Sequence, residues 1–84
     1  MFLSGNWRHV SQRTKERIAP EHHPLVDKAI NHGLNKMAKG KGLPNTSWYR
    51  AVRERKTTIG YICGQGNWIS TIMSTDMVPH GTEV

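Results

Sequence analysis

The sequence predicts an α+β domain in which two N-terminal helices pack on an antiparallel meander sheet of three or four strands. Three observations lead to this prediction. Apolar residues recur at helical spacing between residues 7 and 39, and aromatic and β-branched residues concentrate between residues 47 and 73. A glycine-rich segment, Gly64-Gln65-Gly66, divides the second part. All 84 residues are expected to form this one domain, with residues 74–84 as an extended tail.

The first helix is expected over about residues 7–19. Ser4 and Asn6 are both suitable N-cap residues, because their side-chain oxygens can accept from the free N–H groups of the first turn. Pro20 ends the segment, because proline cannot continue the helical hydrogen bonds. A narrow apolar stripe along this helix is suited to packing on a sheet.

The second helix shows a stronger pattern. Pro24 suits its first turn, and Gly40 suits its C-terminal end. Its apolar positions form one broad face: Leu25, Val26, Ala29, Ile30, Leu34, Met37 and Ala38.

Three strands are expected over residues 47–55, 57–63 and 67–73, with the last two joined as a hairpin. Strict alternation along the last strand would place Trp68, Ser70 and Ile72 on one face and Ile69, Thr71 and Met73 on the other. The predicted core consists of residues on the apolar faces of their elements: Ile30, Leu34, Ile59, Tyr61, Ile69 and Ile72.

The charge is strongly positive. Twelve Lys and Arg oppose six Asp and Glu, which gives a net charge of +6. Residues 1–42 carry eight of these cations against three carboxylates. Such a surplus favours an anionic partner, most often nucleic acid.

The cellular location expected from the sequence is the cytoplasm, or the host cytoplasm if the protein is encoded by a phage. The single cysteine, Cys63, fits a reducing compartment. No apolar run reaches the roughly 18 residues that a membrane span needs, and the N-terminus lacks the pattern of a signal peptide.

His9, Arg13 and Arg17 recur at i, i+4 and i+8, so they share one face of the first helix. Arginine binds phosphate oxygens in a bidentate manner, and histidine can act as an acid or a base near neutral pH. Such a face could hold a phosphodiester and transfer a proton. The alternative is a solvated basic helix face with an exposed histidine.

Further cations extend the candidate nucleic-acid surface. Arg53 and Arg55 are expected on the same strand face as Tyr49, where the aromatic ring could stack on a base, and Arg50 on the other face. The alternative is an edge strand kept soluble by its charge. The full set of nucleic-acid-binding candidates is Lys15, Lys36, Lys39, Lys41, Arg50, Arg53 and Arg55.

No cofactor and no metal site are expected. His22 and His23 precede the second helix and could be combined with Asp27 and His32, but no recognised ligand spacing is present. The two adjacent histidines fit a helix cap or an enlarged phosphate-binding surface better.

The chain resembles a group of small phage and bacterial domains related to the RelE-type ribonucleases. Their superfamily also contains barnase-like and colicin-type ribonuclease toxins. The resemblance rests on His9, Arg13 and Arg17, followed by a short turn and a helix. It also rests on a last strand, residues 68–73, followed by Met, Pro and Gly within residues 77–81.

This resemblance implies His9 as acid or base, Arg13 and Arg17 as phosphate ligands, and Thr71 as a hydroxyl donor on the last strand. The alternative for Thr71 is cross-strand packing, which is the ordinary role of a hydroxyl side chain in a strand.

Two functional hypotheses follow. The first is a metal-independent RNA endonuclease, or a toxin-like relative of one. The second is a non-catalytic basic protein of a phage that binds nucleic acid or blocks a host complex, as an anti-defence protein would. RNA is the main expected partner, with DNA, the ribosome, an antitoxin or a host protein as further candidates, and no membrane.

Overall fold

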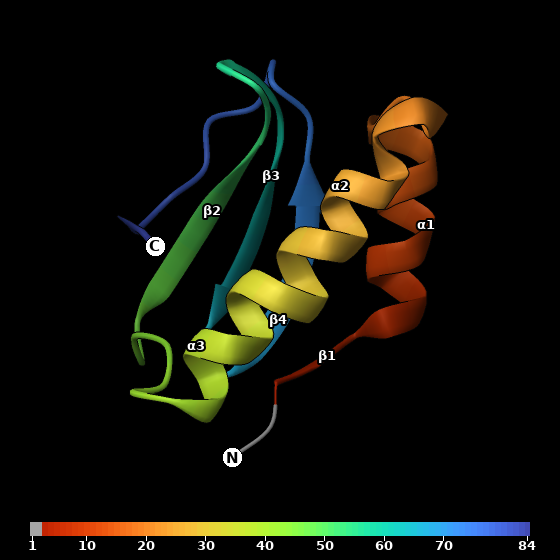
Figure 1. Cartoon of the computed structure of the whole chain (residues 1–84). Coiled ribbons are helices and arrows are strands. Elements are labelled where there is room, and N and C mark those ends of the chain that lie inside the picture. The colour runs from red at the N-terminus through yellow and green to blue at the C-terminus, as the bar shows by residue number, and fades with distance from the viewer. Residues whose placement is uncertain (1–2) are drawn as a thin grey trace.

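Two helical segments cover one face of a five-stranded sheet (Figure 1). The structure, a computed structural model, describes residues 3–84. Its strands and its first helix are β1 (Ser4–Gly5), α1 (Trp7–Arg17), β2 (Ser47–Glu54), β3 (Thr57–Gln65), β4 (Trp68–Met73) and β5 (Thr82–Glu83). The second helical segment comprises η1 (Pro20–His22), α2 (His23–Lys28), η2 (Ala29–Leu34) and α3 (Asn35–Lys39).

Helix α1 begins and ends at residues that the sequence explains. The Asn6 side chain accepts from the backbone N–H of His9 at 3.4 Å, which confirms Asn6 as the N-cap. The helix ends at Arg17, and Ile18 has the extended backbone of a strand. Its buried side chains Val10 and Thr14 form the narrow packing stripe.

The second helical segment begins earlier than predicted and is not uniform. It begins at Pro20 with a 3₁₀ turn, and its middle part, η2, is a π-helical turn. Gly40 ends the segment, and its N–H donates to the Lys36 carbonyl at 3.1 Å. π-helical turns are rare and often occur at functional sites.

The predicted arrangement of the sheet is wrong, although the domain is α+β. The strand order is β1-β4-β3-β2-β5, and only the three central strands form an antiparallel meander. β1 precedes α1 and pairs parallel with β4, and β5 pairs parallel with β2, so the sheet is mixed. Each edge strand has two residues, which is too short to show the alternation that predicts a strand.

The end of the tail, residues 82–84, is paired with the sheet. β5 pairs with β2 at Trp48 and Tyr49, and the N–H of Val84 donates to the Tyr49 carbonyl at 2.8 Å. The backbone therefore holds the end of the described chain on the sheet edge.

The core lies between the helices and the sheet. Ile30, Leu34, Ile69 and Ile72 are buried as predicted, whereas Ile59 and Tyr61 are only half-buried. The largest fully buried side chains are Trp48, Leu34, Ile62, Ile69, Ile72 and Val26.

The sequence predicts the wrong buried face for β3, because the face that carries two glycines is the one that packs against the helices. Gly60 and Gly64 face the helices together with Ile62. A Cβ atom on Gly60 or on Gly64 would lie 2.4 Å from the side chain of Ile18 or of Trp48, respectively. The absent side chains therefore make room for large ones from neighbouring elements. Tyr61 lies on the other face, and Ile59 is half-buried and packs against the core.

Strand β4 departs from strict alternation as well. Ile69 and Ile72 are both buried, while Ser70 between them is exposed. The pairing with β3 shifts by one residue at this point, since Thr71 pairs with Cys63 and Ile69 pairs with Gly64. Such a bulge places two residues against one and re-aims the side chains that follow.

Candidate functional site

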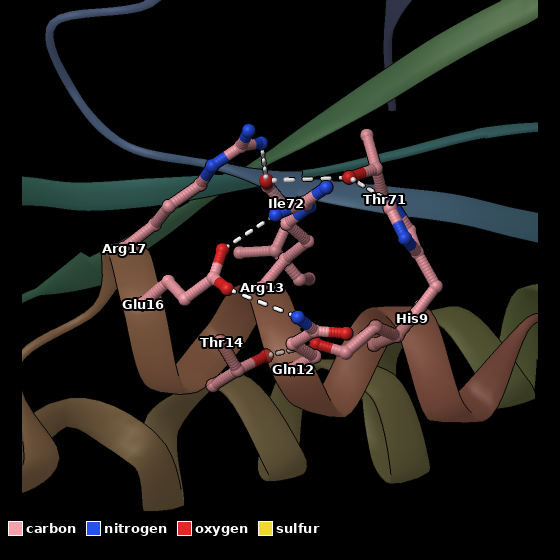
Figure 2. A network of polar contacts seen from close by, with 9 residues as sticks. His9, Gln12, Arg13, Thr14, Glu16, Arg17, Thr71 and Ile72 are labelled. Carbon is pink, nitrogen blue, oxygen red and sulfur yellow. Dashed lines mark hydrogen bonds and ion pairs between the residues drawn. The ribbon is translucent and has the colours of Figure 1, made fainter.

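Helix α1 lies along strand β4 and brings His9 to Thr71 (Figure 2). The His9 Nε2 atom and the Thr71 Oγ1 atom are 3.2 Å apart, and both residues are half-buried. The Thr71 hydroxyl also donates to the Ile72 carbonyl at 3.4 Å. If that bond is kept, the Thr71 oxygen accepts from an N–H at His9 Nε2, and the hydroxyl then orients the imidazole.

Arg17 reaches the adjacent residue of the same strand. Its Nη1 atom donates to the Ile72 carbonyl at 2.7 Å, and its side chain is half-buried (Figure 2). A guanidinium has five N–H donors, so this bond leaves others for an anion. Arg17 is thus fixed at the residue next to Thr71, the residue that His9 contacts.

Arg13 lies between His9 and Arg17 on the same helix face, but a carboxylate engages it. Its Nη1 atom and the Glu16 Oε1 atom are 2.5 Å apart, and Gln12 donates to the other Glu16 oxygen at 3.1 Å. The hydrogen bond from Arg13, followed by that from Gln12, lowers the pKa of Glu16 below its usual value. Glu16 therefore stays ionised and offsets part of the Arg13 charge.

The sheet surface beside His9 faces away from the helices, and we call it the open face. It is formed by half-buried side chains in register across three strands: Tyr49 and Ala51 on β2, Tyr61 and Cys63 on β3, and Thr71 and Met73 on β4. The Tyr49 and Tyr61 rings pack edge to face, with centroids 5.9 Å apart. Aromatic rings on an exposed sheet face can stack on unpaired bases.

Two groups of the open face keep their protons at neutral pH. Burial raises the pKa of the Cys63 thiol, which disfavours the thiolate and therefore a role as nucleophile. Desolvation, followed by the charge of Glu83, raises the pKa of Tyr49. The Tyr49 hydroxyl donates to a Glu83 carboxylate oxygen at 3.4 Å.

The strand arginines take three different positions. Arg50 faces the helices, where its Nη1 atom lies 3.7 Å from the Met37 sulfur. Arg53 is exposed, and its Nη2 atom lies 3.8 Å from one oxygen of the Glu83 carboxylate, whose other oxygen accepts from Tyr49. Arg55 lies in the turn after β2, with a positive φ of 58°, and not on the predicted strand face.

The structure does not bring the candidate lysines to His9. Lys15 is on α1 but lines a groove toward α2. Lys36 and Lys39 are on α3, and Lys41 follows that helix. All four are exposed.

His22 and His23, at the start of the second helical segment, contact the end of β2 and the residue after α1. The His22 Nε2 atom lies 3.4 Å from a Glu54 carboxylate oxygen, and the His23 Nε2 atom lies 2.8 Å from the Ile18 carbonyl. Within residues 3–84, no three His, Cys, Asp or Glu side chains are grouped so that they could hold a metal ion.

No protein-family model, no curated protein and no solved structure matches this chain. The resemblance to RelE-type ribonucleases therefore stays a prediction. In the part of the chain that the structure describes, no helix has the length and apolar character needed to cross a membrane.

Sequence reasoning missed three parts of this site. The Ile72 carbonyl, which Arg17 contacts, leaves no mark in the sequence because it is a backbone group. The pairing of Arg13 with Glu16 could have been found, since the two are three residues apart on a helix. Tyr61 on the open face was predicted in the core, because its strand face is apolar in composition.

Proposed function

We propose that the protein is a metal-independent RNA endonuclease whose reaction takes place between α1 and β4. The observation that supports this proposal is the approach of His9 to Thr71 at 3.2 Å, with Arg17 bonded to the next residue, Ile72. A proton-transfer group, a hydroxyl and a guanidinium then surround one place where a phosphodiester could bind. These are the groups that cleavage by the RNA's own 2′-OH requires.

The proposed reaction begins with proton transfer. A neutral His9 imidazole takes the proton of the 2′-OH, and the 2′-oxygen forms a bond to phosphorus. The bond from phosphorus to the 5′-oxygen breaks, and that oxygen receives a proton from solvent or from protonated His9. The products are a 2′,3′-cyclic phosphate, which water can open to a 3′-phosphate, and a 5′-OH end.

The cations would act on the charge that develops on the phosphorane. Arg17 is already held beside the site and keeps N–H donors for the phosphate oxygens. Arg13 would have to exchange Glu16 for the phosphate, which is feasible because the pair is exposed to solvent. Thr71 would orient His9 or donate to a phosphate oxygen, and Tyr49 and Tyr61 would stack on a base.

The test is cleavage of end-labelled RNA in the presence of EDTA by the wild type and by a His9→Ala variant. We expect the rate to fall by roughly 10²–10⁴, the usual contribution of a positioned acid or base, with little change in RNA affinity. His80→Ala is the matched control, since His80 is exposed in the segment before β5. Equal rates for His9→Ala and the control would contradict the proposal.

A second function has one observation in its favour. Arg13 and Arg17 both have partners within the chain, Glu16 and the Ile72 carbonyl, as expected if the cluster only ties α1 to β4. The protein would then be a non-catalytic phage protein that binds nucleic acid or blocks a host complex. The wild type would bind RNA without cleaving it, and His9→Ala would leave binding unchanged.

A further inference from the structure

A second basic site lies at the other edge of the meander, between the π-helical turn η2 and strand β2. A hollow of about 340 Å³ opens there. Four basic side chains line it: Lys28, His32, Arg50 and Arg53. No Asp or Glu is among its lining residues in the described chain. The carboxylate of Glu83 lies at the far end of Arg53, 3.8 Å from its Nη2 atom.

The fold itself creates room for Arg50 in this hollow. Arg50 points toward the helices from β2, and Gly33 of η2 lies opposite it. A Cβ atom at Gly33 would lie 3.5 Å from three atoms of the Arg50 guanidinium, so the guanidinium packs directly against the helix at the glycine. Leu25 and Ala29 add apolar surface to the same wall. Arg50 is therefore half-buried and positioned, while Lys28 and His32 are exposed beside it.

The strand edge next to this hollow is open. β5 pairs with β2 only at Trp48 and Tyr49. Among the described residues, no strand pairs with the outer edge of β2 from Arg50 to Glu54. The backbone edge of β2 beside the hollow is therefore not paired with another strand of the described chain, which leaves it available to an extended ligand.

The basic surface continues along the helix. Lys28, His32 and Lys36 are spaced by four residues, and a second hollow of about 370 Å³ contains His32, Lys36 and Lys39. The two hollows share His32. A line of basic side chains that extends over several helical turns suits a ligand with repeated negative charges. Arg50 and Arg53 add guanidinium groups, which bind phosphate oxygens in a bidentate manner.

We propose that this hollow binds a phosphodiester of the RNA backbone at a distance from the cleaved bond. The proposal rests on the proposed function, because it gives the same RNA a second contact. β2 and β4 lie on either side of β3, so the two sites are at least about 10 Å apart at a strand spacing of about 4.8 Å. One RNA chain would contact His9 and Arg17 with one phosphodiester and Arg50 and His32 with another.

The test uses a Lys28→Gln, His32→Gln double variant. Both side chains are exposed on the helix, so their loss should leave the fold intact. The control is Lys56→Gln, His80→Gln, which removes the same residue types from exposed positions that line neither hollow. The probe is a fluorescent 2′-O-methyl RNA oligonucleotide, which binds but cannot be cleaved, and its affinity is measured by anisotropy over a salt series.

The double variant should bind this RNA several-fold more weakly than the control, and its log–log salt slope should be flatter by about 0.7, the value for one phosphate contact on a single strand. Equal affinities and slopes for the double variant and the control would overturn the proposal. So would a wild type that fails to bind the RNA but binds a polyglutamate peptide through Lys28 and His32, which would make the ligand an acidic protein. Because the probe cannot be cleaved, this binding test does not depend on ribonuclease activity. Absence of cleavage would therefore count against the proposed function alone, and not against the second RNA contact.

Discussion

Glu16 controls how much of the Arg13 charge is available at the candidate site. The carboxylate accepts from both Arg13 and Gln12, and these bonds lower its pKa, so it remains ionised throughout the neutral range. A phosphate that approaches Arg13 must compete with it. The strength with which Arg13 binds a phosphate therefore depends on how tightly it binds Glu16.

Glu16→Gln should therefore strengthen RNA binding. The substitution keeps the size of the side chain but removes its negative charge, so Arg13 becomes free to bind phosphate. We expect a gain of about two- to fivefold, the range that an exposed ion pair allows, in the affinity for a 2′-O-methyl RNA. Glu21→Gln is the control, because Glu21 is exposed in η1 and has the same charge. A similar gain in both variants would mean that only the net charge matters.

Cys63 provides a second test at the residue scale. Burial raises its pKa, so the thiolate is scarcer at neutral pH than in a free thiol. Iodoacetamide should alkylate Cys63 in the folded protein more slowly than it alkylates N-acetylcysteine at pH 7 to 8. The rate should rise only at a pH above the range of an ordinary thiol, and unfolding in urea should abolish the difference. Rapid alkylation of the folded protein at pH 7 would show a reactive thiol on the open face instead.

Strand β3 decides which face of the sheet the helices cover. Its glycines face the helices, and the Trp48 ring lies over Gly64 while its indole N–H donates to the Gly66 carbonyl at 2.8 Å. The half-buried ring of Tyr61 is consequently left on the opposite face, in register with Ala51 and Met73. The same arrangement creates the open face beside His9.

Gly64→Ala should destabilise the protein. The new Cβ atom would lie 2.4 Å from both the Trp48 ring and the Trp68 carbonyl oxygen, and the latter is a backbone atom that cannot easily move. We expect a loss of about 1–3 kcal/mol in the free energy of unfolding, as for other overpacked cores. Urea denaturation measures this loss.

Gly33→Ala is the matched control for this prediction. Its Cβ atom would meet the Arg50 guanidinium at an ordinary contact distance of 3.5 Å, and alanine is the better helix former. The free energy of unfolding should stay unchanged or rise slightly. Equal destabilisation by both substitutions would contradict the packing account of Gly64.

The elements differed in how well the sequence predicted them. The Asn6 cap, the hairpin of β3 and β4, and the end of the helical segment at Gly40 follow from local residue chemistry and were predicted correctly. The edge strands β1 and β5 were missed, because two-residue strands depend on backbone pairing with distant partners. The sequence predicted the wrong buried face for β3. Glycines do not mark a position as apolar, although large side chains from neighbouring elements pack over them here.

The sequence predicted the helical part of the candidate site better than the part that lies on the strands. The helical spacing of His9, Arg13 and Arg17 placed them on one face, and the structure brings that face to Thr71. The strand arginines could not be placed by alternation, since the pairing of β2 and β3 shifts between Val52 and Arg53. A bulge depends on the partner strand and cannot be counted along one segment.

At the scale of the whole molecule, positive charge gathers on two separate surfaces. One follows α1 beside β4, and the other follows η2 and α3 beside β2. The sheet lies between them, and the side chains of its open face are half-buried. A single RNA strand could contact both surfaces.

Replacing Arg13 and Arg17 together with Gln should flatten the salt dependence of RNA binding. Each cation that neutralises a phosphate releases counterions from the RNA, so the loss of a contact reduces the number of counterions released on binding. The log–log slope should decrease in magnitude by about 1.4 to 1.8 for two contacts. Fluorescence anisotropy between low and physiological salt measures it. An unchanged slope would place the nucleic-acid interface elsewhere, on the surface formed by η2, α3 and β2.

The most direct test of the central claim is the chemical identity of the ends that the protein leaves on RNA in the presence of EDTA. If His9 takes the proton of the 2′-OH, mass spectrometry should find 2′,3′-cyclic phosphate or 3′-phosphate ends together with 5′-OH ends. A substrate with a 2′-deoxy nucleotide at the cleaved position should be bound and left intact. Products with 5′-phosphate and 3′-OH ends, or cleavage that requires Mg²⁺, would contradict the account.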